Sequence, residues 1–245
     1  MARYDFRTPR LYVDAPLNEG AHVVLDAAQA HYLGTVLRLR LDSAVLAFNG
    51  RDGEWGARLA AQKRVSSLVI ETRTRPQPAP GDLHYAFAPL KGARLDYMVQ
   101  KAVEMGASRL QAVQTRHSQV PRVNTARMHA NAVEAAEQCG ILSLPEIAPP
   151  VTFAAFIAAR DPVRWLVFCD EDAEAASPVA ALQRIGRPPL AVLVGPEGGF
   201  ADDEREALLA QPNVVRLSLG PRILRGDTAA VAALTLVQAL NGDWH

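Results

Sequence analysis

Short apolar runs dominate the first 75 residues of this chain, and most of them are too short to form a helix. Runs of this length that end in turn residues are typical of buried strands. Asn49-Gly50 and Asp52-Gly53 predict a tight connection between two of them, and one helix is expected at 27–37. We therefore predict a small β domain over residues 1–75, with strands at 11–13, 21–25, 44–48, 54–59 and 67–70.

From residue 82 onward, strand-length apolar runs alternate with stretches of helical character. Strands are expected at 83–88, 110–114, 165–169, 190–194 and 214–219. Helices are expected at 92–105, 123–139, briefly after Pro149-Pro150, at 178–185, from 202, and in the strongly apolar segment that ends at Gly242. This alternation is typical of an α/β fold. The proline-rich segment 76–81 predicts a stiff linker, which leaves residues 82–245 to the second domain.

The composition is ordinary for a globular protein, with 49% hydrophobic and 21% charged residues. No apolar run is long enough to span a bilayer, and the first residues lack the apolar core of a signal peptide. Cys139 and Cys169 lie far apart and have no metal-ligand spacing. We expect reduced thiols, a cytoplasmic protein, and neither a membrane nor a metal among its partners.

Two loops in the segment 190–229 predict a binding site. The strand-length runs before them end abruptly, at Gly195-Pro196 and Gly220-Pro221. Ligands of open α/β sheets bind at the carboxyl ends of strands, where these loops are expected. The first loop fits neither the Walker A motif nor G-x-G-x-x-G. The acidic residues 202–204 at the next helix start would repel a phosphate, so a ligand without phosphate is favoured.

The formal net charge is zero, which argues against an indiscriminate nucleic-acid binder. The charge is nevertheless uneven, because residues 1–80 carry 11 basic and 8 acidic residues while residues 151–245 carry 8 and 12. The basic part lies away from the glycine-rich loops, as expected if one end of the molecule grips RNA and the other holds a small molecule. An asymmetry of this size also arises by chance.

Two motifs, Leu193-Val-Gly-Pro-Glu-Gly-Gly-Phe200 and Leu217-Ser-Leu-Gly-Pro-Arg-Ile-Leu-Arg-Gly-Asp-Thr-Ala229, resemble the paired motifs of the SPOUT methyltransferases. Within that superfamily the chain is most similar to the bacterial 16S ribosomal RNA uracil-N3 methyltransferases. The resemblance implies a trefoil-knotted C-terminal domain that binds S-adenosylmethionine, an N-terminal PUA-like barrel that binds RNA, and a homodimer. The chain departs from the family at Asp227, where a glutamate is usual, and at Ala201, where a serine usually caps the helix.

The resemblance also implies roles for individual residues. Contacts to S-adenosylmethionine are expected from Leu193, Val194, Gly195, Pro196, Glu197, Gly198, Gly199, Ser218, Leu219, Gly220, Ile223, Leu224 and Thr228. Contacts to ribosomal RNA are expected from Arg3, Arg7, Arg10, Arg38, Arg40, Lys91, Arg94 and Arg116. For any single one of these basic residues, a solvated surface position is an equally good interpretation.

Methylation of uracil N3 requires loss of the N3 proton or stabilisation of the anion that develops on O2 and O4. Arg222 and Arg225 are the expected source of that stabilisation, with a phosphate anchor or a salt bridge as the alternative. Asp227 and Glu197 are candidate bases, although each also suits a helix cap or a loop-orienting acceptor. A second acidic pair, Glu134 and Glu137, shares one helix face but has no histidine or metal spacing beside it, which favours a solvent-facing pair.

The sequence thus predicts an S-adenosylmethionine-dependent enzyme that methylates N3 of a uridine in the 16S ribosomal RNA of the small ribosomal subunit. A SPOUT enzyme that modifies a ribose 2′-hydroxyl or a guanine stays open, because such enzymes share the fold. So does a catalytically silent RNA-binding protein, which would need the basic domain but not the glycine-rich pair. A nucleotide-dependent enzyme would need a phosphate-binding motif that the sequence lacks.

Overall fold

The computed structural model describes residues 5, 7–62, 65–79, 81–171, 173, 177–186 and 189–244. The chain divides into two compact units. Unit 1 consists of Met1–Ala79 and Val133–Leu144, and unit 2 consists of Pro80–Ala132 and Pro145–His245. The predicted domain boundary at 76–81 stays a prediction. Unit 1 also contains the segment 133–144, so a single boundary in the sequence cannot separate the two units.

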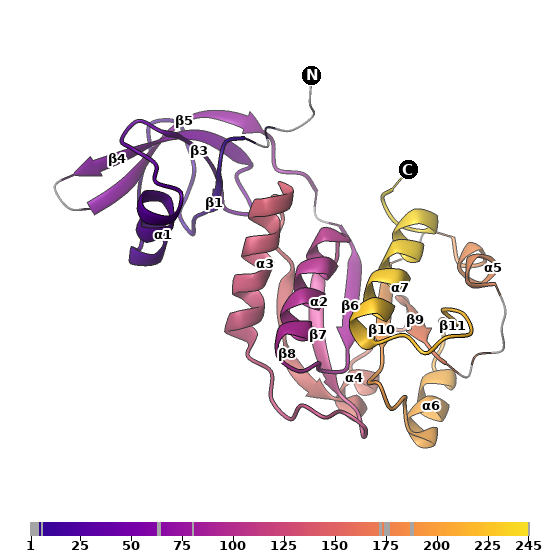
Figure 1. Ribbon diagram of the computed structural model, residues 1–245. Coiled ribbons are helices and arrows are strands. Elements are labelled where there is room, and N and C mark those ends of the chain that lie inside the picture. The colour runs from indigo at the N-terminus through magenta and orange to yellow at the C-terminus, as the bar shows by residue number, and fades with distance from the viewer. Residues whose placement is uncertain are drawn as a thin grey trace. The chain divides into compact units, whose positions relative to one another are not determined.

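Unit 1 contains one five-stranded sheet in the order β1-β3-β4-β5-β2 (Figure 1). Its strands are β1 (Arg10–Tyr12), β2 (His22–Val24), β3 (Ala44–Phe48), β4 (Glu54–Gln62) and β5 (Val65–Arg75). All pairings are antiparallel except that between β1 and β3. The helix α1 (Ala27–His31) continues as a π turn at Tyr32–Val36. Asp26 starts it with a capping box, since its carboxylate accepts from Gln29 N and Gln29 Oε1 accepts from Asp26 N. All five predicted strands are present.

Glu54 is a buried carboxylate of unit 1 that pairs with two arginines. Its carboxylate accepts from Arg10 Nε at 2.9 Å and from Arg75 Nη2 at 2.6 Å, and the side chains of Glu54 and Arg10 are both 4% exposed. Burial alone would raise the pKa of Glu54, but the hydrogen bonds from both arginines and from Thr74 outweigh it and lower the pKa. The expectation that Arg10 contacts a phosphate is therefore wrong, because its guanidinium is buried against a carboxylate inside the protein.

The segment 133–144 covers part of the sheet of unit 1. Ala136 and Leu142 pack against Phe48 of β3. Glu137 accepts a hydrogen bond from the backbone N–H of Tyr12 at 2.8 Å. Burial raises the pKa of Glu137 to about 7, against the hydrogen bond from Tyr12 and with a further contribution from the carboxylate of Glu134. The expected solvent-facing pair is thus wrong for Glu137, whereas Glu134 is exposed.

Unit 2 is built on a six-stranded sheet in the order β11-β9-β10-β6-β7-β8, and all its pairings are parallel (Figure 1). The strands are β6 (Leu83–Phe87), β7 (Arg109–Gln114), β8 (Glu146–Thr152), β9 (Trp165–Cys169), β10 (Leu190–Val194) and β11 (Val214–Leu217). Every residue of β10 is buried, as expected for a strand that lies inside a parallel sheet with both faces covered. The α/β prediction is confirmed.

A helix follows each of these strands: α2 (Ala93–Glu104), α3 (Thr125–Cys139), α4 (Phe153–Ala158), α5 (Pro178–Gln183), α6 (Asp202–Leu209) and α7 (Gly226–Leu240). The part of α3 from residue 133 onward belongs to unit 1. α2 packs beside α7, which in turn contacts α5 and β10 (Figure 1). α4 contacts α6 and the strands β7 and β8. Within the described part of the chain, no helix is long and apolar enough to cross a lipid bilayer. The trefoil knot stays a prediction, because strand order alone does not define how the chain is threaded.

Candidate functional site

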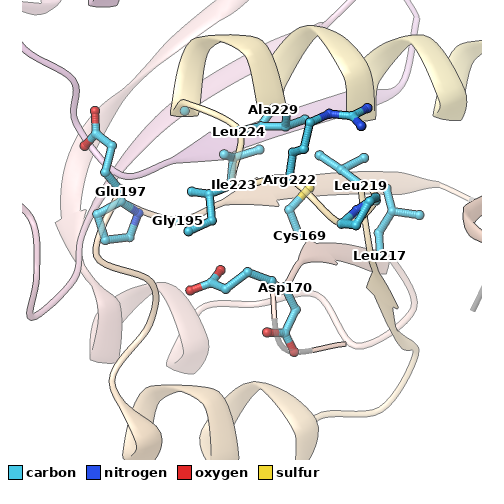
Figure 2. A pocket seen from close by; sticks show the side chains of 16 residues that line it. Cys169, Asp170, Gly195, Glu197, Leu217, Leu219, Arg222, Ile223, Leu224 and Ala229 are labelled. Carbon is cyan, nitrogen blue, oxygen red and sulfur yellow. The ribbon is translucent and has the colours of Figure 1, made fainter. Parts of the chain in front are cut away.

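The carboxyl ends of β9, β10 and β11 surround a cleft in unit 2 (Figure 2). Its lining consists of residues 169–171, 194–197, 217, 219–224, 226 and 229, and we call it the acidic cleft. Because the strands are parallel and neighbouring, their ends and the loops that follow come together at one edge of the sheet. This is the edge at which ligands bind in open α/β sheets. The two glycine-rich loops thus meet where the sequence predicts a site.

Acidic side chains give the cleft its charge. Asp170, Glu171 and Glu197 line it, together with one arginine, Arg222. Figure 2 shows Arg222 and Glu197 on opposite sides of the cleft, with Asp170 between them and below. Burial alone would raise the pKa of Asp170, but hydrogen bonds from Arg205 and Arg216 outweigh it and lower the pKa. Asp170 is therefore an ionised anchor of the cleft wall.

The rest of the lining is apolar or backbone. Leu217, Leu219 and Leu224 form an apolar wall, and Ile223 extends it with a side chain that is 88% exposed. Gly220 adopts φ 99, and no atom lies within 4 Å of its Cβ position, so the wall stays open at that point. A cleft with an apolar wall and a few acidic groups suits a flat ligand that carries positive charge.

Cys169 contributes a thiol to the floor of this cleft. Burial raises its pKa to about 12, and the neighbouring carboxylates of Asp170 and Glu171 add to the rise. The thiol is therefore neutral at physiological pH.

The structure separates the thirteen predicted cofactor contacts into two groups. Eight of them line the acidic cleft, namely Val194, Gly195, Pro196, Glu197, Leu219, Gly220, Ile223 and Leu224. The other five, Leu193, Gly198, Gly199, Ser218 and Thr228, are not among the lining residues. Leu193 is fully buried within β10, where its side chain belongs to the core.

Gly198 and Gly199 have a structural role in the turn beside the cleft. Both their carbonyl oxygens lie 3.1 Å from His117 Nδ1. Gly199 adopts φ 70, and a Cβ at this position would collide with the carboxylate of Glu171. Neither glycine lines the cleft, so their predicted backbone contact to the ligand stays a prediction. Gly198 lies beside His117, and Gly199 lies beside the cleft residue Glu171.

Seven lining residues were absent from the predicted set of cofactor and catalytic residues: Cys169, Asp170, Glu171, Leu217, Pro221, Gly226 and Ala229. The end of β9 carried a usable signal, because three acidic residues, 170–172, directly follow its apolar run. Gly226 and Ala229 are small residues in the first turn of α7, where they leave room beside the cleft.

A second cleft adjoins the first and is basic. Pro89, Leu90, Lys91, Arg94, Gln119, Val120, Glu197 and Arg225 line it, and we call it the basic cleft. Its one acidic lining residue, Glu197, also lines the acidic cleft. Arg94 Nη1 donates to Glu197 Oε1 at 2.7 Å, which ties the first turn of α2 to the loop after β10.

The three predicted catalytic residues lie in different places. Arg222 lines the acidic cleft and Arg225 the basic one, and both are exposed. Among the described residues, neither arginine forms a salt bridge to an acidic neighbour. Asp227 lines neither cleft, and its Oδ1 accepts from the backbone N–H of Thr228 at 2.9 Å at the start of α7. The geometry of Asp227 supports the helix-terminus interpretation.

The predicted RNA contacts are distributed over both units. Arg7, Arg38 and Arg40 are exposed in unit 1, and Lys91 is exposed in unit 2. Arg94 is paired with Glu197, and Arg116 is paired with Asp203 through a 2.6 Å contact at the exposed surface. Arg3 lies outside the described residues.

The acidic start of α6, residues 202–204, does not line the acidic cleft. Glu204 is buried and accepts from Ala201 N at 3.1 Å and from Arg116 N at 2.8 Å. Glu204 thereby satisfies the backbone N–H of Ala201, the residue that stands where the family usually has a serine. The carboxylates that do line the cleft would repel a phosphate ligand there.

Two family models match the sequence. One, described as an RNA methyltransferase domain, matches residues 77–238, and the other, described as an RNA methyltransferase PUA domain, matches residues 25–70. The ribosomal RNA small subunit methyltransferase E of Rickettsia conorii is 30% identical to this chain, over 94% of this chain and 95% of its own length. The chain belongs to the ribosomal RNA small subunit methyltransferase E family.

Solved structures of this family and its relatives agree with the fold. A ribosomal RNA small subunit methyltransferase E from Neisseria gonorrhoeae, bound to S-adenosylmethionine, is 26% identical with a TM-score of 0.86, over 98% of this chain and 100% of its own. A methyltransferase from Legionella pneumophila, also in complex with S-adenosylmethionine, is 28% identical with a TM-score of 0.83, over 97% and 99%. The family confirms the predicted PUA and α/β methyltransferase domains, and the chain is an RNA methyltransferase.

Proposed function

We propose that this protein methylates N3 of a uridine in the 16S ribosomal RNA of the small ribosomal subunit, with S-adenosylmethionine as the methyl donor. The observation that carries the proposal is the acidic cleft at the ends of β9, β10 and β11, in a chain of this family. A cytoplasmic location follows from the proposed substrate.

The acidic cleft fits S-adenosylmethionine, which carries a sulfonium and an ammonium group and no phosphate. Glu171 and Glu197 offer carboxylates to positive charge, and Leu217, Leu219 and Leu224 offer an apolar surface for the adenine. The open space at Gly220 leaves room for backbone contacts to the ligand. When bound, S-adenosylmethionine supplies a methyl group that is already activated as an electrophile.

The residues of the protein then have to present uracil N3 and balance the charge that develops on the base. The basic cleft adjoins the acidic cleft and carries Lys91, Arg94 and Arg225. Preorganised cations of this kind stabilise negative charge on O2 and O4 more than they stabilise the neutral base. Arg225 is the arginine of the second motif that lies in this cleft, whereas Arg222 faces the acidic one.

RNA affinity in this proposal comes largely from unit 1, through Arg7, Arg38 and Arg40, with phosphate contacts that position the target.

We also propose a homodimer. α7 buries Ala229, Ala230, Ala233, Leu234 and Val237 within one chain, whereas Val231, Ala232, Leu236 and Leu240 are only partly buried, which leaves apolar surface for a second copy. The exposed aromatic side chain of Tyr97 on α2, 46% accessible, offers a surface for a second copy.

The reaction is tested by deletion of the gene and by reconstitution. Loss of the gene should remove one 3-methyluridine from small-subunit RNA, seen as a lost reverse-transcription stop and by nucleoside mass spectrometry. Purified protein with S-adenosylmethionine should restore it. A strain that keeps its 3-methyluridine and loses a ribose methyl group or a methylguanine would show that the protein modifies a different position.

A further inference from the structure

We propose that Glu197 accepts the N3 proton of the target uracil, with the base seated in the basic cleft. The inference rests on the proposed function and adds a named acceptor to it. It starts from one observation: among the described residues, Glu197 alone lines both the acidic and the basic cleft. A group that takes a proton from N3 has to lie where the base and the methyl donor meet, and this residue occupies that boundary.

The geometry of the carboxylate leaves one oxygen available. Arg94 Nη1 donates to Oε1 of Glu197 at 2.7 Å, and within the described chain no hydrogen bond reaches Oε2. The side chains of Arg94 and Glu197 are 38% and 37% exposed, so a substrate can approach them. Figure 2 shows the Glu197 carboxylate at the edge of the acidic cleft, turned away from Asp170 and the apolar wall. Arg94 thus orients the carboxylate while Oε2 stays free to accept from N3–H.

The other carboxylates near the clefts do not meet these conditions. Asp170 is 2% exposed and bound by Arg205 and Arg216, so its oxygens are already used. Glu171 lines only the acidic cleft and not the basic one. Asp227 lines neither cleft and accepts from the N–H of Thr228.

The step is balanced as a single displacement. The N3 proton passes to Oε2 of Glu197, and the electron pair that remains on N3 forms the new bond to the methyl carbon. The pair of the broken carbon–sulfur bond stays on sulfur, which becomes a neutral thioether, and the proton on Glu197 is later lost to water. Lys91 and Arg225 lie in the same cleft and stabilise the negative charge on O2 and O4 while the proton is transferred.

A purely structural role is the competing interpretation, in which Glu197 only holds α2 to the loop through Arg94. Two matched variants separate the roles. Glu197→Gln removes both the proton acceptor and the ion pair, whereas Arg94→Gln breaks the same ion pair and keeps the carboxylate. Single-turnover methylation of small subunits from the deletion strain should fall on the order of 10²-fold or more for Glu197→Gln, the usual contribution of a general base. Arg94→Gln should lose much less in the saturated rate, with its main defect in RNA affinity.

Substrate acidity gives a second readout. RNA that contains 5-fluorouridine carries a more acidic N3–H, so it should restore much of the rate of Glu197→Gln and little of the rate of Arg94→Gln. Both variants are assayed at saturating S-adenosylmethionine, because Glu197 also lines the acidic cleft. Equal losses in both variants without rescue would overturn the proposal. A wild-type protein that forms no 3-methyluridine would instead overturn the proposed function, which keeps the two failures distinct.

Discussion

Arg216 Nε donates a 2.7 Å hydrogen bond to Asp170 Oδ2, and this contact ties β11 to the residue that follows β9. The side chain of Asp170 is 2% exposed and also binds Arg205. Removal of one partner from a buried ion pair leaves uncompensated charge in a poorly solvated place. Asp170→Asn should therefore lower the free energy of unfolding by about 3 kcal/mol, measured by urea denaturation. The exposed pair of Arg116 and Asp203 is the control, and Asp203→Asn should cost less than about 1 kcal/mol.

Acid should weaken the same contact. The pKa of Asp170 is lowered in the folded protein, so the pair contributes its full stability above the unfolded pKa of about 3.9. That contribution is lost as the pH falls through the lower folded pKa. The wild-type protein should therefore lose stability more steeply than Asp170→Asn on titration to strongly acidic pH, and parallel acid limbs would contradict the assignment.

The carboxyl of Glu137 predicts the opposite pH dependence. Its pKa is raised to about 7, so between the unfolded value of about 4.3 and 7 the folded state binds more protons than the unfolded state. Stability from this group is present at low pH and is lost as the pH rises through 7. Glu137→Gln keeps an oxygen for the N–H of Tyr12 and should remove this slope, measured as the thermal midpoint between pH 5.5 and 8. Glu134→Gln removes only the smallest of the contributions to this pKa, so it should keep most of the slope.

Strain at Gly199 should reach the acidic cleft through Glu171. A side chain at φ 70 costs about 1–2 kcal/mol, and Gly199→Ala would also displace the carboxylate of Glu171. Calorimetry should show weaker S-adenosylmethionine binding. Gly186 adopts φ 62 with no atom within 4 Å of its Cβ position, so Gly186→Ala carries the backbone strain without the collision. Equal affinities in the two variants would show that Glu171 does not contact the cofactor.

The exposed arginines of unit 1 predict a salt-dependent RNA affinity. Arg7→Ala and Arg38→Ala should each weaken binding and lower the slope of log affinity against log salt by about 0.7–0.9, if each removes one phosphate contact. S-adenosylmethionine affinity should not change. Arg58 is the matched control, because it is half-exposed in the same unit but paired with Glu71 at 3.3 Å. A loss of cofactor binding in the arginine variants would contradict the proposed division of labour.

Sedimentation tests the homodimer. The chain has a mass of 26.5 kDa, so a dimer should sediment as 2 × 26.5 = 53 kDa at micromolar concentration. Tyr97→Glu should shift the equilibrium toward monomer, because it places a charge at the proposed contact. Leu209 on α6 is exposed to a similar extent, 45% against 46%, and Leu209→Glu should leave the dimer intact. An active wild-type monomer at this concentration would exclude the assembly.

The sequence predicted most strands because their apolar runs are local signals, and β8 shows where such signals fail. Pro149 and Pro150 lie inside β8, and a proline pair argues against a strand. The sheet tolerates them because β8 is at its edge and pairs only with β7, with a register irregularity between Gln111 and Val113. A proline lacks the N–H that an inner strand would need on both sides.

The sequence also did not show which residues far apart in the chain become partners in the fold. Arg10 resembles an exposed arginine until its partner Glu54, 44 residues away, is placed beside it. The segment 133–144 likewise packs against strands that precede it by about a hundred residues, so a division at the linker could not include it. The glycine-rich loops were recognisable from their motifs. Which motif residues line the cleft depends on where each lies on its strand, as Leu193 shows, because its side chain is buried in the core.

The raised pKa of Cys169 has a chemical consequence for an enzyme that handles an alkylating agent. A thiolate is a far better nucleophile than a thiol, and one beside a sulfonium would compete with the RNA for the methyl group. The pKa of about 12 keeps the sulfur of Cys169 protonated. Burial is the main cause of this raised pKa, and the carboxylates of Asp170 and Glu171 add to it. In the proposed function, the burial that places Cys169 in the floor of the cleft thus also protects the protein from alkylating itself.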